Sequence, residues 1–322
     1  MAKRHLSSQP GLIPCQKRLI DTYRVIRSGS MMMPSRPLPH TRTYPVNAID
    51  LAVHHWPAPD SAAPPLVFAH ATGFHGRVFD AIIEMFPDHP AYAIDLRGHG
   101  QSSGGPIADW RLVADDVAGF LGQEGITGSV GIGHSMGAHT LLQVAADLPD
   151  IFTRLVLFDP VILAPEYYTA DETLYTADNP HPAIRRKRDF ASADAMIERF
   201  ANRDPYNLFD PRVFEDYCRH GLVPAPSGEG LELACAPEVE ASVYASSRSN
   251  GAILEAARKV DIPALVVRAK STSLMDFKSS PTWPELASIL PQGTDLYRPD
   301  RTHFHPFEDP ADAARIIADW IG

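Results

Sequence analysis

The five residues Gly133 to Gly137 read Gly-His-Ser-Met-Gly and constrain the fold of this chain more than any other segment. The pattern G-x-S-x-G is typical of a nucleophile elbow, a tight turn from a buried strand into a helix that projects the serine hydroxyl. The two glycines leave room where the turned backbone is crowded. An apolar run at 129–132 comes before the turn, and a predicted helix at 138–146 follows it. The required strand–turn–helix context is therefore present.

Short apolar runs alternate with helical patterns on both sides of this turn. The apolar runs that predict strands are 66–69, 91–94, 155–158 and 264–268, and the strand pattern returns at 295–298. Helical patterns cover 78–86, 110–121 and 310–321. Continuously apolar runs of this length are typical of strands buried on both faces. The alternation predicts an α/β fold with a mostly parallel, doubly wound sheet, and the runs 42–46 and 49–56 add an antiparallel hairpin at its start.

Two segments do not follow this alternation. Residues 161–246 are aromatic and rich in charge, with helical patterns and no pattern of a buried strand, so we expect a helical cap. The core would then comprise residues 44–160 and 247–322. Residues 1–43 carry several prolines and no sustained apolar periodicity, which favours a flexible extension. Their composition, rich in arginine and poor in acids, also fits a targeting segment, and an over-long start with initiation near Met31 is a further alternative.

The charge and the cysteines exclude several classes of function. The net charge is −10, yet residues 1–43 hold eight basic side chains and one acid, so the rest of the chain carries −17. Such a body repels nucleic acid and anionic membrane surfaces, and no apolar stretch approaches the roughly 20 residues of a membrane helix. Cys15, Cys218 and Cys235 lack the spacing of a disulfide framework or a zinc site. We expect a cytoplasmic protein without metal or cofactor.

Four segments in this order give the chain its resemblance to a known family. They are the loop His70–Phe74, the turn Asp95–Ser102, the elbow, and Thr302–His303–Phe304. Together they resemble the α/β-hydrolases over about residues 44–322 except the insertion. The resemblance implies an α/β-hydrolase fold with a helical cap.

The resemblance also assigns roles to individual residues. Ser135 matches the family's nucleophile, and a serine hydroxyl needs a base within hydrogen-bond reach. His303 matches that base, because it lies just beyond the last predicted strand. We expect His134 to pack beneath the elbow, His70 to brace the oxyanion loop and His99 to be structural.

The acid that orients His303 has two candidates. Asp276 follows the penultimate predicted strand, where the family usually places the acid, although the loop before it is longer than usual. Asp159 ends the strand after the elbow helix, where haloalkane dehalogenases carry the acid, and it could instead cap the first turn of the insertion. Asp95 ends a strand before the elbow, so we interpret it as structural.

An oxyanion hole needs backbone N–H groups that face the developing negative charge. The resemblance assigns one of them to Met136, the residue after the serine. The second comes from the loop after the first buried strand, where Ala71 replaces the common glycine. Thr72 is favoured over Gly73 and Phe74, and Phe74 is expected to form an apolar wall of the acyl pocket.

A serine in the elbow predicts hydrolysis of a small to medium apolar ester or lactone through an acyl-enzyme intermediate. Epoxide hydrolases and haloalkane dehalogenases carry aspartate there, which argues against both activities. The same triad also permits carbon–carbon bond hydrolysis, amide hydrolysis or perhydrolysis, and a non-catalytic binding protein is the alternative of another class. The basic run 185–188 could contact an anionic substrate, but a solvated helix face is favoured. The sequence does not define the oligomeric state.

Overall fold

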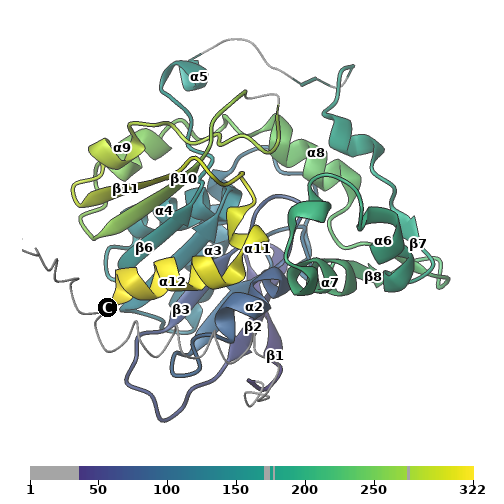
Figure 1. Cartoon of the computed structure of the whole chain (residues 1–322), viewed down its shortest axis with the longest axis horizontal. Coiled ribbons are helices and arrows are strands. Elements are labelled where there is room, and N and C mark those ends of the chain that lie inside the picture. The colour runs from purple at the N-terminus through teal and green to yellow at the C-terminus, as the bar shows by residue number, and fades with distance from the viewer. Residues whose placement is uncertain (1–35, 170–174, 177, 274–275) are drawn as a thin grey trace, which may run out of the picture.

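The computed structural model describes residues 36–322 apart from 170–174, 177 and 274–275. Its main sheet has eight strands in the order β1-β2-β4-β3-β5-β6-β10-β11 (Figure 1). Their bounds are β1 His40–Val46, β2 Ile49–Trp56, β3 Leu66–Ala69, β4 Ala91–Ile94, β5 Ser129–His134, β6 Phe152–Phe158, β10 Ala264–Ala269 and β11 Gly293–Arg298. Strand β2 is antiparallel to β1 and β4, whereas the other pairs are parallel. The predicted α/β fold with a mostly parallel sheet is confirmed.

Helices cover both faces of this sheet, which explains the continuously apolar strands. One face carries α3 (Arg111–Gln123), α4 (Met136–Asp147), α9 (Ile253–Ala257) and α10 (Leu286–Ile289). The other carries η1 (Gly76–Phe79), α2 (Asp80–Ile83), α11 (His305–Glu308) and α12 (Pro310–Ile321). None of the helices among the described residues has both the length and the apolar character needed to cross a membrane.

The N-terminal part of the fold begins earlier than residue 44. Strand β1 starts at His40 and pairs with β2 over its whole length. Just before it, the Arg36 guanidinium donates hydrogen bonds to the carbonyls of Trp56, Ile83, Phe86 and His89. Residues 36–43 are therefore attached to the core and do not belong to a free extension. The expectations for Cys15, Met31 and the rest of 1–35 lie outside the described residues.

The inserted segment contains both helices and short strands. Its helices are α5 (Glu166–Thr169), η2 (Pro182–Arg185), α6 (Ala193–Phe200), η3 (Tyr206–Leu208), α7 (Pro211–His220) and α8 (Pro237–Ala245). A small antiparallel sheet joins β7 (Asp189–Phe190), β9 (Leu231–Leu233) and β8 (Leu222–Pro224). Strands of two or three residues are too short to give an alternating pattern, so the sequence predicted helices alone. Figure 1 shows α6, α7 and this small sheet beside the main sheet.

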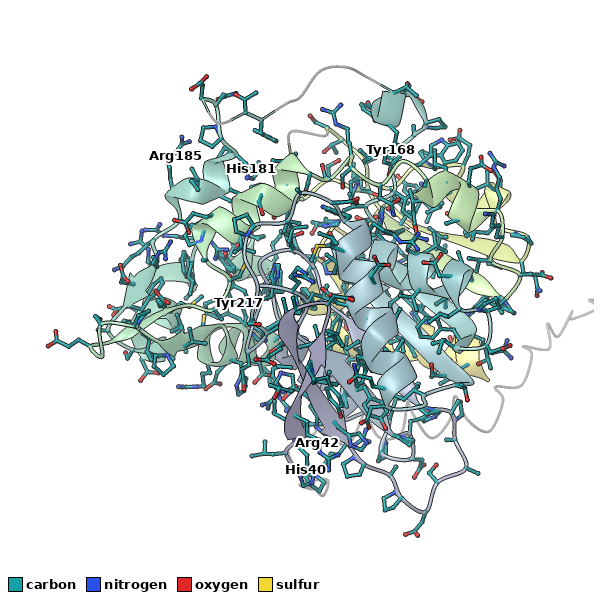
Figure 2. The ribbon with its side chains drawn as sticks, turned by 180° about the vertical axis from the view of Figure 1, so that it is seen from behind. His40, Arg42, Tyr168, His181, Arg185 and Tyr217 are labelled. Carbon is teal, nitrogen blue, oxygen red and sulfur yellow. The ribbon has the colours of Figure 1, made fainter. Side chains whose placement is uncertain are left out.

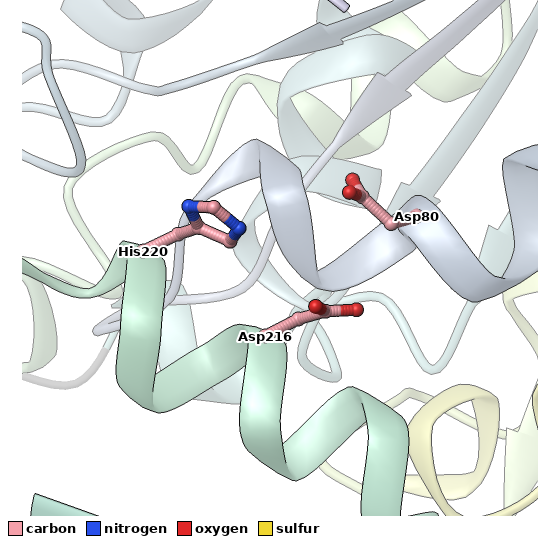
Figure 3. Close-up of side chains that lie close together, drawn as sticks. All are labelled: Asp80, Asp216 and His220. Carbon is pink, nitrogen blue, oxygen red and sulfur yellow. The ribbon is translucent and has the colours of Figure 1, made fainter. Parts of the chain in front are cut away.

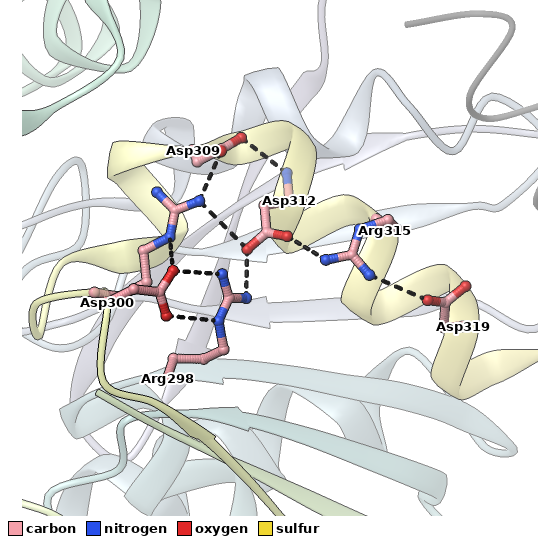
Figure 4. Close-up of polar contacts among 7 residues, drawn as sticks. Arg298, Asp300, Asp309, Asp312, Arg315 and Asp319 are labelled. Atoms are coloured by element: carbon pink, nitrogen blue, oxygen red, sulfur yellow. Dashed lines mark hydrogen bonds and ion pairs between the residues drawn. The ribbon is translucent and has the colours of Figure 1, made fainter. Parts of the chain in front are cut away.

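Ion pairs hold the loop between β11 and α12 at both ends (Figure 4). Arg298 at the end of β11 pairs with Asp312 of α12 at 2.5 Å, and Arg301 in the loop pairs with Asp309 at 2.8 Å. Asp309 also caps α12, because its side chain accepts the Asp312 N–H at 3.0 Å. A single exposed ion pair contributes only about 0–1 kcal/mol, but these pairs act on one short loop that carries His303.

Helix α4 begins very close to the sheet, and two glycines permit this approach. A Cβ atom on Gly137 would lie 2.1 Å from the Ala69 carbonyl oxygen of β3. A Cβ atom on Gly133 would lie 2.4 Å from the Ala138 Cα. Both neighbours are backbone atoms, so only glycine fits at either position without a shift of β3 or α4.

We expect Gly137→Ala to destabilise the protein by about 3 kcal/mol or more, because the added methyl group would overlap the backbone of β3. Gly122→Ala is the matched control. Gly122 lies in α3 with no atom near its Cβ position, and alanine there should stabilise the helix by about 0.5–1 kcal/mol. Chemical denaturation of both variants measures the effect. A Gly137→Ala midpoint equal to that of the wild type would contradict the close approach.

Candidate active site

Ser135 lies at the turn between β5 and α4 in a strained backbone conformation. Its φ of 57° and ψ of −117° are unusual for a residue with a side chain, and its side chain is buried. Hydrogen bonds hold the turn, since the Ser135 N–H donates to the Phe158 carbonyl at 3.0 Å and the Ser135 carbonyl accepts the His139 N–H at 3.2 Å. The surrounding strands and helix therefore maintain the strain.

The structure brings His303 and Asp159 to this serine. His303 Nε2 lies 3.1 Å from Ser135 Oγ, and His303 Nδ1 lies 2.6 Å from Asp159 Oδ2. An ionised carboxylate only accepts, so Nδ1–H is the donor and Nε2 is left to accept the serine proton. Of the two acid candidates, the structure therefore places Asp159 in the hydrogen-bond chain with His303 and Ser135.

Asp159 is fully buried at the end of β6, and several donors stabilise its charge. Its Oδ1 accepts from the Ala269 N–H at 3.0 Å, from Ser280 Oγ at 2.5 Å and from Thr282 Oγ1 at 3.3 Å. Burial by itself raises the pKa of this carboxyl group, but the hydrogen bond and charge of His303, with the Ser280 hydroxyl, bring the pKa below its usual value. Asp159 is therefore ionised at neutral pH and orients the imidazole ring.

Asp276 lies in the turn beside His303 and does not contact the imidazole ring. Its carboxylate accepts from the Lys278 N–H at 3.0 Å and from Thr272 Oγ1 at 3.3 Å. The Lys278 carbonyl in turn accepts the His303 N–H at 2.8 Å. Asp276 therefore shapes the turn that holds the backbone of His303.

Two buried histidines, His134 and His70, form hydrogen bonds with backbone groups around the site. His134 Nε2 donates to the His303 carbonyl at 2.8 Å, and the two rings lie 4.9 Å apart. Burial, followed by the charge of His303, lowers the pKa of His134 well below its usual value, so His134 stays neutral. His70 joins the loop after β3 to that after β4, because it donates to the Ala71 carbonyl and accepts the Leu96 N–H at 2.9 Å. The sequence suggested packing for His134 but gave no sign of its bond to the His303 backbone.

One of the four candidate oxyanion donors already has a partner. The Phe74 N–H donates to the Ala71 carbonyl at 3.1 Å. The Thr72 N–H has no acceptor among the described residues. Met136 is the first residue of α4, so its N–H has no partner within the helix.

Aromatic side chains of the core and the cap meet around Phe74. Its ring centroid lies 5.0 Å from Tyr217 and 6.0 Å from Phe209, both in the cap. From the core, Phe307 lies at 5.1 Å and Phe304 at 6.2 Å. Since Phe304 directly follows His303, this aromatic cluster lies next to the His303 ring.

The basic run 185–188 divides between the surface and the cap interior. Arg185 is exposed on the outer side of the cap (Figure 2). Arg186 is paired with the buried Glu240, and it donates to the hydroxyl groups of Tyr217 at 2.8 Å and Tyr206 at 3.2 Å. The favoured interpretation of the whole run as a solvated face therefore does not apply to Arg186.

Comparison with known proteins shows which protein family has this fold and site. The profile of the alpha/beta hydrolase family matches residues 66–316. The chain belongs to this family.

Several relatives carry the names of lipases or hydrolases. The chain is 28% identical to the lipase LipV of Mycobacterium tuberculosis over 286 residues, which cover 85% of this chain and 98% of the relative. It is 25% identical to the 2-(acetamidomethylene)succinate hydrolase of Mesorhizobium japonicum, over 73% of this chain and 82% of that protein. A match to the sn-1-specific diacylglycerol lipase ABHD11 of Mus musculus is 31% identical but spans 103 residues, 31% of this chain and 34% of that lipase.

The solved structures confirm the fold. The crystal structure of E-2-(acetamidomethylene)succinate hydrolase aligns with a TM-score of 0.69 at 21% sequence identity. The alignment covers 88% of this chain and 99% of the solved chain.

A cluster of potential metal ligands lies between core and cap (Figure 3). Ligand atoms of Asp80, Asp216 and His220 lie within 4.8 Å of one another. However, Arg77 binds both carboxylate oxygens of Asp80, at 2.6 to 3.0 Å, and Arg212 lies 3.8 Å from Asp216. Arg77 thus neutralises Asp80, while Arg212 donates mainly to Glu84, and the cluster is best described as a contact between α2 and α7.

We expect Asp216→Asn to raise the melting temperature at pH 8. Burial and the charge of Asp80 raise the pKa of Asp216 to about 7, against about 3.9 for an unfolded chain. Folding therefore favours the protonated form, so stability falls as the pH rises from about 4 to 7. The gain over wild type should shrink towards pH 4.

Thermal unfolding between pH 4 and 8 measures this effect. Glu215→Gln is the control, because Glu215 is an exposed acid of the same helix, paired with Arg219. A difference between Asp216→Asn and wild type that does not change with pH would contradict the raised pKa.

Proposed function

We propose that the protein is a serine hydrolase that cleaves an ester or lactone of a small to medium apolar substrate. One observation carries this proposal, namely the hydrogen-bond chain from Ser135 through His303 to Asp159 on a strained elbow. A carboxylate bound to the imidazole ring is what a hydrolase needs and what a non-catalytic binding protein has no use for. The alternative of a pure binding protein is therefore disfavoured.

In the first half of the reaction, Ser135 Oγ attacks the substrate carbonyl carbon while its proton passes to His303 Nε2. Asp159 stabilises the imidazolium ion that forms. The tetrahedral intermediate collapses, the bond to the leaving oxygen breaks, and that oxygen takes the proton from His303. The product is an acyl group esterified to Ser135. In a lactone, the leaving oxygen stays attached to the acyl group.

In the second half, His303 Nε2 accepts a proton from water as the water oxygen attacks the acyl carbon. Collapse of this second tetrahedral intermediate breaks the bond to Ser135 Oγ, which takes the proton back. A carboxylic acid leaves, and the side chains return to their starting protonation states.

The N–H groups of Met136 and Thr72 are proposed to hold the negative oxygen of both intermediates. Support for Thr72 over Phe74 comes from their hydrogen bonds, because the Phe74 N–H already donates to the Ala71 carbonyl, whereas the Thr72 N–H has no acceptor among the described residues. Phe74 is proposed to form the apolar wall of the acyl pocket, since it joins core and cap aromatics next to Phe304.

The names of the relatives support ester chemistry first and amide chemistry second. Lipase LipV aligns along nearly its whole length. The 2-(acetamidomethylene)succinate hydrolase is the observation that favours an acetamido compound as the second candidate substrate class. The same triad serves both reactions, because only the leaving atom changes from oxygen to nitrogen.

We expect Ser135→Ala to abolish labelling by a fluorophosphonate probe and to reduce p-nitrophenyl butyrate turnover by at least ~10³-fold, because no other group can form the acyl-enzyme. Ser288→Ala is the control, since Ser288 is an exposed serine of α10. Gel fluorescence and steady-state rates are measured. Unchanged turnover by Ser135→Ala would rule out the proposed mechanism.

Asp159→Asn and Asp276→Asn separate the two acid candidates. An amide in place of the Asp159 carboxylate cannot stabilise the imidazolium ion, so kcat should fall by about 10³- to 10⁴-fold. Asp276→Asn should stay within about tenfold of wild type, because Asp276 binds only the turn beside His303. Fluorophosphonate labelling rates and kcat are compared for both variants. A larger loss with Asp276→Asn would overturn the assignment of Asp159.

A further inference from the structure

The segment 278–282, which follows β10, contacts Oδ1 of Asp159, whereas His303 contacts Oδ2. Within it, Ser280 is 2% exposed, and its Oγ lies 2.5 Å from Asp159 Oδ1. Ser280 Oγ accepts the Thr282 N–H at 3.3 Å, and the Ser280 N–H donates to the Lys270 carbonyl at 2.9 Å. Because a carboxylate only accepts, the Ser280 hydroxyl is the donor to Asp159.

Ser280 is distinct from the other two donors to Asp159 Oδ1. The Ala269 N–H belongs to the backbone and is present whatever the side chain. The Thr282 hydroxyl lies farther away, at 3.3 Å, and it also lies 2.8 Å from the Pro160 carbonyl, which is the closer acceptor. Of the two side-chain hydroxyls near Asp159 Oδ1, that of Ser280 therefore makes the shorter contact. A buried charge depends strongly on each such donor.

Resting on the proposed function, we infer that Ser280 is a positioning residue for the hydrolytic reaction. Its hydroxyl fixes the rotamer in which Asp159 meets His303 Nδ1, and it sets how strongly the carboxylate holds the protonated imidazole. Ser280 itself reaches neither Ser135 nor the proposed reacting atoms, so it acts through Asp159.

Two effects of Ser280→Ala follow. The carboxylate loses a donor and becomes more basic, so it holds the imidazolium form of His303 more strongly. The imidazole ring of His303 then loses its proton only at higher pH. The acid limb of the rate plotted against pH should therefore move upward by about 0.5–1 pH unit. The maximal rate should fall by about ten- to a hundredfold, because a hydrogen bond to a charged group is lost and Asp159 is less firmly held.

Ser279 provides a matched control in the same loop. It is also buried, at 6% exposed, but its Oγ accepts the Thr272 N–H at 2.7 Å and the Ser273 N–H at 3.1 Å. Ser279→Ala therefore removes a buried hydroxyl and loosens the loop without touching Asp159. A purely structural effect of the loop would appear in both variants as lower stability and an unshifted acid limb.

The experiment measures the second-order rate of fluorophosphonate labelling against pH, which needs no knowledge of the substrate. Wild type, Ser280→Ala, Ser280→Cys and Ser279→Ala are compared as full-length proteins after their folding is checked by circular dichroism. The thiol of Ser280→Cys is of similar size but is a weaker donor, so its acid limb should move in the same direction. This variant decides the question if Ser280→Ala does not fold.

We expect the acid limb of the labelling rate to move to higher pH in the Ser280 variants and to stay unchanged in Ser279→Ala. An acid limb in the Ser280 variants that coincides with that of Ser279→Ala overturns the role of Ser280. Failure of the proposed function looks different, because wild-type labelling would then persist in Ser135→Ala. If labelling depends on Ser135 but the acid limb does not shift in the Ser280 variants, the positioning role of Ser280 is refuted and the proposed function stands.

Discussion

The buried charge of Asp159 is the constraint on which the arrangement of the site depends. A fully buried carboxylate must be paired and hydrogen-bonded, and the four contacts of Asp159 come from three separate segments. The end of β10 supplies the Ala269 N–H, the following loop supplies the hydroxyls of Ser280 and Thr282, and the loop after β11 supplies His303. The charge is stable only when all three segments are in place, which ties the candidate site to the completed sheet.

The parallel sheet makes this meeting possible. Strands β5, β6, β10 and β11 run in the same direction, so the segments after them emerge at one edge. The backbone of His303 is then held on both sides, by the Lys278 carbonyl and by His134 Nε2. Ion pairs between the end of β11 and α12 limit the movement of the same loop. His303 is therefore positioned by backbone contacts as well as by contacts of its ring.

Patterns that depend on neighbouring residues could be predicted from the sequence, and those that depend on distant partners could not. The apolar runs predicted the buried strands, and the last helix has the predicted bounds Pro310–Ile321. Asp159 and Asp276 both follow strands, so sequence position alone could not choose between them. The loop after β10 decides the geometry, because it turns Asp276 towards Lys278 and Ser280 towards Asp159. Arg186 and Glu240 are 54 residues apart, so their pairing leaves no local signal.

The hydrogen-bond chain and the aromatic cluster draw on different parts of the chain. The hydrogen-bond chain of Ser135, His303 and Asp159 is made by core segments alone. The aromatic wall is shared, because Phe74 of the core packs on Tyr217 and Phe209 of the cap. The donors around Asp159 thus lie in the core, whereas the aromatic cluster includes residues of the insertion. A substitution in the insertion can therefore alter the aromatic cluster without touching the contacts of Asp159, and one fold can carry sites for many substrates.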